Sequence, residues 1–161
     1  MYRQIVLAYD GSKEGRIALR EGALLAKQVG AGVHLLSIIP DTAGRRWAEG
    51  AQPGVMAQEE QTFRAVFEDG LAKLKRIGIE PQARMVRGEP TREIAAYAKE
   101  VAADLVVVSL RRQGVWSRWW SGDNGAYLSD TLGCSILVAR SLMDDAEFQR
   151  RINLLRETPK A

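Results

Sequence analysis

The sequence predicts an α/β fold, a single domain in which one five-stranded parallel sheet lies between two layers of helices. Short apolar runs typical of buried strands alternate along the chain with longer segments of helical periodicity, and turn residues separate them. This alternation favours parallel strands joined by right-handed crossovers. A length of 161 residues suits one domain with a substantial core.

The first strand and helix are marked by their boundary residues. An apolar run over 5–9 leads into Asp10-Gly11-Ser12, a turn in which the Ser12 side chain can cap a helix. Small residues recur on one face of that helix, which lets it pack close to a sheet, and Gly30 is expected to end it. The second strand, over 33–39, is expected to break at Pro40.

The rest of the chain continues the alternation. A glycine-rich loop over 42–54, long enough to form a flap, precedes a helix over 55–76 with a clear apolar face. The further expected elements are a strand over 81–87, a helix over 91–102, a strand over 105–109, a helix over about 123–132, a strand over 134–139 and one more helix over 144–156. The domain is expected to span 1–140, with 141–161 as a polar, partly helical extension.

Composition and charge narrow the classes of protein. With 46% hydrophobic and 27% charged residues and no apolar run near the ~20 residues of a membrane span, the chain is expected to be a soluble globular protein. The N-terminus has no secretory signal pattern, and the single cysteine, Cys134, fits a reducing compartment, so we expect a cytoplasmic protein. Basic residues are dispersed at a net charge of +3, which argues against nucleic-acid binding.

The ends of the predicted strands carry the candidate site. In open parallel sheets, ligands bind beyond the C-terminal ends of the strands, where the strand order reverses. Asp10, Ile38, Gly88 and Ser109 all lie at such ends and are expected to converge on one crevice.

Catalytic and metal sites are not indicated. The only histidine, His34, lies inside the second strand and is expected to be structural, and Cys134 is expected to be a small buried apolar residue. No nucleophile–histidine–carboxylate set or metal cluster can be assembled at a usable spacing. We therefore do not expect an enzyme.

Three motifs occur in order along the chain. They are Val6-Leu7-Ala8-Tyr9-Asp10-Gly11-Ser12, then Val86-Arg87-Gly88-Glu89-Pro90 with Ala103-Asp104-Leu105-Val106-Val107-Val108, and finally Leu132-Gly133-Cys134-Ser135-Ile136-Leu137-Val138-Ala139-Arg140. They resemble the opening turn, the central Gly-x-Pro helix with its following strand, and the closing strand of the universal stress protein family. The resemblance covers 1–140 and implies an adenine-nucleotide α-hydrolase-like fold.

The resemblance also implies where a nucleotide would bind. Nucleotide-binding members carry Gly-x2-Gly-x9-Gly-(Ser/Thr) after the fourth strand, and those places fall on Ser109, Arg112, Gly122 and Asp123. One glycine of three is kept, and a carboxylate replaces the final hydroxyl. Members without the glycine motif do not bind ATP, and this loop is closer to theirs.

Two residues at the strand ends have two interpretations each. The resemblance implies that Asp10 accepts from the adenine amino group and that Ile38 lies against the base. Alternatively, the Asp10 side chain bonds its own downstream backbone in a turn, and Ile38 is an ordinary strand residue.

The loop residues also leave alternatives open. Ser109 replaces a glycine with a modest clash and offers a hydroxyl. Arg112 can grip a phosphate in a bidentate manner or fill the volume that phosphates need. Asp123, predicted at a helix start, can accept from the first-turn N–H groups and repel a phosphate by about 4 kcal/mol at ~4 Å. Arg112 and Asp123 therefore favour weak or absent binding of ATP or AMP.

Two segments are candidate contact surfaces. Trp116, Trp119 and Trp120 crowd the same loop, where they can contact a protein partner, pack on the domain itself, cover the crevice or stack on a base. The strand over 134–139 is expected at the sheet edge, and the resemblance implies a homodimer paired through it. We therefore expect a homodimeric regulatory module acting through protein contacts. The alternatives are an adenine-nucleotide sensor and, least favoured, an ATP hydrolase or nucleotidyl-transfer enzyme.

Overall fold

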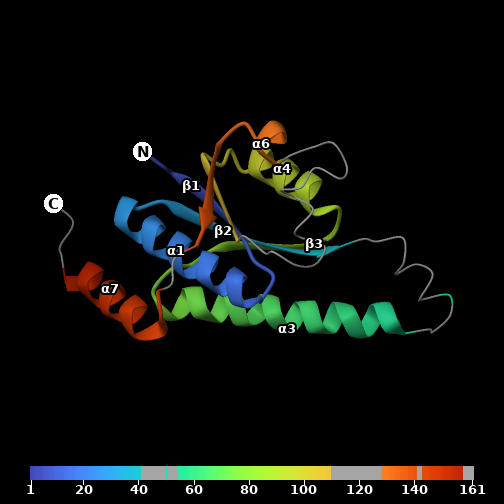
Figure 1. Ribbon diagram of the computed structural model, residues 1–161, viewed down its shortest axis with the longest axis horizontal. Coiled ribbons are helices and arrows are strands. Elements are labelled where there is room, and N and C mark those ends of the chain that lie inside the picture. Colours follow the sequence, from blue (N-terminus) through green and yellow to red (C-terminus); the bar gives the residue numbers. More distant parts are fainter. Residues whose placement is uncertain (41–49, 51–53, 110–127, 141–142, 158–161) are drawn as a thin grey trace.

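Strands and helices alternate along the chain in the computed structural model, which describes residues 1–40, 50, 54–109, 128–140 and 143–157 (Figure 1). The elements in these residues are β1 (Gln4–Ala8), α1 (Lys13–Val29), β2 (Gly32–Pro40), α3 (Val55–Arg76), β3 (Gln82–Gly88), α4 (Pro90–Glu100), β4 (Leu105–Ser109), α6 (Leu128–Thr131), β5 (Ser135–Ala139) and α7 (Asp145–Glu157). The predicted order of strands and helices is thus confirmed wherever the chain is described.

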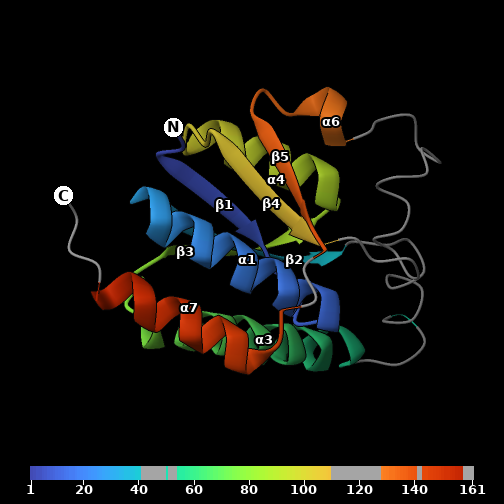
Figure 2. The same ribbon diagram turned by 60° about the vertical axis from the view of Figure 1, so that its left-hand side comes forward.

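The five strands form one parallel sheet in the order β3-β2-β1-β4-β5. From β1 the chain adds β2 and then β3 on one side, and it then returns to add β4 and β5 on the other, as Figure 2 shows. The order therefore reverses between β1 and β4. The predicted α/β fold is confirmed, and the reversal fixes where a crevice for a ligand would lie.

Each face of the sheet has its own core. Side chains alternate along β1, so that Ile5, Leu7 and Tyr9 pack with α1 and α3, whereas Val6 and Ala8 pack with α4 and α6. Figure 1 shows α1 and α3 below the sheet and α4 and α6 above it. The three predicted layers are confirmed.

Helix α1 has the ends that the sequence predicts. The Ser12 side chain accepts from the N–H of Gly15, and Gly30 ends the helix in the left-handed conformation with φ 71°. The close packing expected of its small residues is present at Gly22, where a Cβ atom would lie 2.4 Å from Cδ2 of Leu7.

Several boundaries differ from the prediction by one or two residues, and two of these differences have a clear physical reason. Helix α4 begins at Pro90, because the Glu89 carboxylate accepts from the N–H groups of Thr91 and Arg92 and so acts as the cap. Pro40 does not break β2 but is its last paired residue, opposite Gly88. A proline is tolerated there because a strand end needs no further N–H donor.

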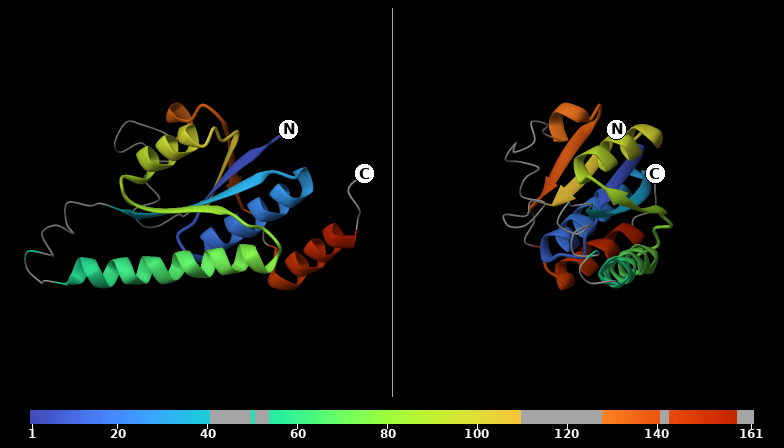
Figure 3. Two further views of the ribbon diagram at one scale, coloured as in Figure 1. Left: turned by 180° about the vertical axis from the view of Figure 1, so that it is seen from behind. Right: turned by 90° about the vertical axis from the view of Figure 1, so that its right-hand side faces the viewer.

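The predicted C-terminal helix is confirmed as α7, which packs against α1 (Figures 2 and 3). Phe148 and Ile152 are buried and Leu155 is partly buried, as a stripe at helical spacing requires. Arg20 of α1 forms an ion pair with Asp145 and also donates to the carbonyl oxygen of Met143. Within the described ranges, none of the helices is long and apolar enough to cross a membrane.

Candidate functional site

The reversal of strand order brings Asp10 and Ser109 to the same end of the sheet. Leu7 of β1 is paired with Val107 of β4, so the two strands run side by side in register. Asp10 follows β1 by two residues, and Ser109 is the last residue of β4. Both residues are partly buried. The structure therefore places these two predicted site residues at the C-terminal ends of the two strands that flank the reversal.

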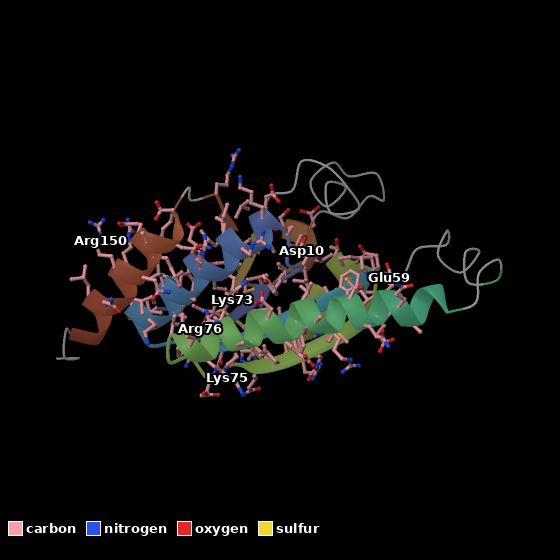
Figure 4. The ribbon with its side chains drawn as sticks, turned by 90° about the horizontal axis from the view of Figure 1, so that it is seen from below. Asp10, Glu59, Lys73, Lys75, Arg76 and Arg150 are labelled. Carbon is pink, nitrogen blue, oxygen red and sulfur yellow. The ribbon has the colours of Figure 1, made fainter. Side chains whose placement is uncertain are left out.

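The Asp10 carboxylate organises the start of α1. Its Oδ1 atom accepts from the backbone N–H of Ser12 at 3.0 Å and from the Ser12 hydroxyl at 2.6 Å. The Ser12 oxygen in turn accepts from the N–H of Gly15 at 2.9 Å. The turn-forming interpretation of Asp10 is confirmed, and Figure 4 shows the residue at the N-terminal end of α1. A contact with adenine stays a prediction.

Tyr9, which the sequence analysis did not single out, directly precedes this turn and connects it to α3. Its ring is 1% exposed, and its hydroxyl lies 3.4 Å from Oδ2 of Asp69 on α3. Burial, followed by the charge of Asp69, raises the pKa of Tyr9 to about 12, so the phenol stays protonated and donates. A tyrosine among small apolar residues at a strand end was the only signal in the sequence.

The predicted site residues Ile38 and Gly88 lie on β2 and β3, away from the reversal between β1 and β4. Ile38 is 1% exposed and packs in the core beneath α4 with Ile94 and Tyr97. Gly88 ends β3, the edge strand, which β2 separates from β1. A Cβ atom on Gly88 would lie 2.6–2.8 Å from the Glu93 side chain, so this glycine allows α4 to approach. Ile38 therefore has a packing role, and Gly88 lies away from the reversal.

The other predicted site residues, Arg112, Gly122 and Asp123, lie outside the described residues. The same holds for the tryptophans of that loop, which are Trp116, Trp119 and Trp120. Their roles stay predictions.

His34 forms buried polar contacts in the middle of β2, opposite Val6 of β1 and away from the C-terminal ends of the strands. Its Nε2 atom lies 2.9 Å from Oε1 of Gln4 and its Nδ1 atom 3.3 Å from the Tyr97 hydroxyl. Burial lowers the pKa of His34, which favours the neutral ring. The guanidinium of Arg84 covers the Tyr97 ring at 4.5 Å from its centroid. This arrangement fits the expected structural role.

Cys134 is partly buried rather than fully buried, because it lies just before the edge strand β5. Burial, with a smaller effect of the Asp104 charge, raises the pKa of its thiol, which disfavours the reactive thiolate. Among the residues that the structure describes, no group of three histidine, cysteine or carboxylate side chains can hold a metal ion.

Solved structures share the fold. The chain is similar to a universal stress family protein from Burkholderia pseudomallei, with 22% identity, a TM-score of 0.64, and coverage of 87% of this chain and 97% of that one. A universal stress protein from Archaeoglobus fulgidus in complex with dAMP gives 18% identity, a TM-score of 0.63, and coverage of 86% and 98%. A universal stress protein in complex with cAMP is similar with 18% identity and a TM-score of 0.62, and the match covers 86% of this chain and 97% of that one.

Sequence comparison assigns the family. No curated protein sequence matches the chain. The family model described as "Universal stress protein family" matches residues 1–140, which include β1 to β5 and both residues at the reversal. The chain therefore belongs to the universal stress protein family.

Proposed function

We propose that this chain is a cytoplasmic homodimeric regulatory module that acts through protein contacts and binds adenine nucleotides weakly or not at all. The observation that carries the proposal is the apolar outer strand β5. It is the last strand of the sheet, and Ile136, Leu137 and Val138 in its centre are only partly buried. An apolar edge strand of this kind favours pairing with another chain.

A second copy of the chain is the partner proposed for this edge. Antiparallel pairing of two β5 strands would supply main-chain partners to both edges and join the two sheets into one. It would also cover the exposed parts of Ile136 and Val138, which pack on the α4 side of the sheet, and of Leu137, which packs on the α1 side.

Sedimentation analysis of the purified protein tests the dimer. We expect wild type to sediment as a dimer and Ile136→Lys to sediment as a monomer, because a charge would be buried in the paired edge. Ala83→Lys is the matched control, since Ala83 is exposed on β3 at the opposite edge. Loss of the dimer in the control, or a monomeric wild type, contradicts the proposal.

The residues of the nucleotide loop support the weak-binding part of the proposal. Ser109 and Arg112 stand where nucleotide-binding relatives have glycine, and Asp123 stands where they have a hydroxyl. A carboxylate at that place repels a phosphate and competes for its donors. At the reversal, Oδ1 of Asp10 already accepts two hydrogen bonds from Ser12.

An adenine-nucleotide sensor is the second candidate. Two structures that share the fold were solved with cAMP and with dAMP, and Asp10 and Ser109 flank the reversal of this sheet. In this reading Asp10 contacts the base, and Arg112 with Gly122 contacts the phosphates.

Calorimetry with AMP, ADP and ATP, with and without magnesium, separates the two candidates. The first expects a Kd weaker than about 100 μM, and an increase in affinity of at least about tenfold in the double variant Arg112→Gly, Asp123→Ser. Tighter binding by wild type that Arg112→Ala abolishes would establish the sensor instead. Phosphate release from ATP and magnesium in a turnover assay would contradict both.

A further inference from the structure

A groove of about 320 Å³ lies between α1, β5 and α7, on the α1 side of the sheet. Its lining is apolar where Leu24 and Leu25 of α1, Leu137 of β5 and Met143, just before α7, come together. Leu24 is buried, whereas the other three side chains are only partly buried against the core. Apolar surface is therefore left uncovered directly beside the outer strand of the sheet.

Polar residues surround this lining. They are Glu21 and Gln28 of α1 and Arg151 of α7. Glu21, Leu24, Leu25 and Gln28 follow the spacing of one helical stripe, and Figure 2 shows α1 between the sheet and α7. An apolar centre within a polar rim is the composition of a protein–protein interface.

The size of β5 indicates what covers the groove. Stable interfaces bury about 800 Å² on each partner and involve roughly 20–30 residues a side. Strand β5 has five residues, and one of its edges is already paired with β4. A stable dimer through the other edge therefore needs contacts from neighbouring elements, and on the α1 side the groove is the apolar surface that adjoins β5.

Antiparallel pairing determines which surface of a second copy meets the groove. A two-fold axis that joins two β5 strands into one sheet is perpendicular to that sheet, so the α1 sides of both copies face the same way. The Leu137 side chain of a second copy would therefore emerge on the α1 side, beside the groove. Glu21 and Arg151 at the rim have opposite charges, so the two copies would not bring together patches of like charge.

We propose that this groove is part of the homodimer interface and receives apolar side chains of a second copy. Its volume equals that of roughly ten water molecules at ~30 Å³ each, which is enough for more than one aliphatic side chain. Met143 suits such a surface because its flexible thioether adapts to what packs on it. This role of the groove rests on the proposed β5 homodimer.

The C-terminal extension would then take part in dimerisation. Met143 and Arg151 lie beyond residue 140, the last residue matched by the family model. One wall of the groove is thus an addition to the family domain, and the interface is larger than β1 to β5 and their helices alone would provide.

Solvent accessibility of methyl groups, measured by NMR with a soluble gadolinium chelate, tests the proposal on the full-length protein. We expect the methyl groups of Leu25 and Met143 to be relaxed at least about twofold less in the wild-type dimer than in the monomeric variant Ile136→Lys. Leu154, which is 57% exposed on α7 and does not line the groove, should be relaxed equally in both proteins. A monomeric wild type would contradict the proposed function itself. A wild-type dimer with groove methyl groups as accessible as in the monomer would overturn the role of the groove alone.

Two matched variants on α7 test the position of the interface. Arg150 and Arg151 are both exposed and both form an ion pair with Glu147, and of the two Arg151 lines the groove. We expect Arg151→Trp to raise the Kd of the dimer at least about fivefold, because the ring would occupy the mouth of the groove, and Arg150→Trp to change it less than about twofold. Sedimentation equilibrium measures both values, and equal Kd values for the two variants would overturn the proposal.

Discussion

The Tyr97 hydroxyl lies 3.3 Å from Nδ1 of His34 in the buried contact between α4 and β2. On the other side of the ring, Oε1 of Gln4 is an acceptor at 2.9 Å from Nε2. The proton of the neutral ring therefore belongs on Nε2, and Nδ1 accepts from the tyrosine. A second proton on the ring would make Nδ1 a donor, so the Tyr97 hydroxyl would have to rotate and accept instead.

This contact predicts a dependence of stability on pH. Burial lowers the pKa of His34 below 6.5, so the unfolded chain binds a proton more readily than the folded chain. The stabilising contribution of His34 is complete above about pH 6.5 and is lost as the pH falls through the lowered pKa. We expect His34→Gln to cost about 1–3 kcal/mol at about pH 8, and less at about pH 5. Urea denaturation at both pH values measures the difference, and a constant difference would contradict the prediction.

Removal of the Ser12 hydroxyl should loosen the turn between β1 and α1. Ser12→Ala leaves the Gly15 N–H without its cap and removes one of the hydrogen bonds to Asp10. We expect a loss of about 1–2 kcal/mol in the free energy of unfolding and faster amide exchange in the first turn of α1. Ser129→Ala is the control, because the exposed Ser129 hydroxyl donates to the side chain of the neighbouring Asp130. This variant should change the free energy of unfolding by less than about 0.5 kcal/mol.

A methyl group on Gly22 should destabilise the domain in spite of better helix propensity. Its Cβ atom would lie 2.4 Å from Cδ2 of Leu7 and 3.3 Å from Val107, both of which are buried. Overpacking costs about 1–3 kcal/mol, against a propensity gain of about 1 kcal/mol. We expect Gly22→Ala to lower the Tm by about 2–4 °C. Gly133→Ala, which meets nothing within 4 Å, should leave the Tm unchanged.

The packing of α7 against the domain should depend on the apolar face of the helix. Ile152 is 1% exposed and Leu154 is 57% exposed, two residues apart on the same helix. Ile152→Ala should cost about 2–5 kcal/mol and increase amide exchange throughout α7, whereas Leu154→Ala should cost less than about 0.5 kcal/mol. Equal exchange in the two variants would show that α7 is held by its ends rather than by its apolar stripe.

Signals contained within one element were sufficient to predict most of the fold. The cap at Ser12, the left-handed Gly30 and the apolar stripe of α7 each depend on a few neighbouring residues, and each is present. The start of α4 was misplaced because Glu89 caps the helix with a long side chain, although Pro90 in its first turn was a local signal.

The site was predicted less completely because it depends on strand order. That Asp10 and Ser109 flank the reversal follows from topology and was expected, whereas the burial of Ile38 under α4 and the edge position of Gly88 depend on which strand lies where. The contact between Tyr9 and Asp69 joins residues 60 positions apart, and no local pattern indicates it.

Gly70 on α3 leaves room for the ring of Tyr9, the residue just before Asp10. A Cβ atom there would lie 2.7 Å from Cε1 of Tyr9, so any larger residue would displace the Tyr9 ring from its present position. Because Tyr9 directly precedes Asp10, a backbone shift of Tyr9 that relieved this contact would also move the Asp10 carboxylate. The small residue at this point of α3 thus helps to set the position of the acid in the Asp-Gly-Ser turn, although it lies about 60 residues further along the chain.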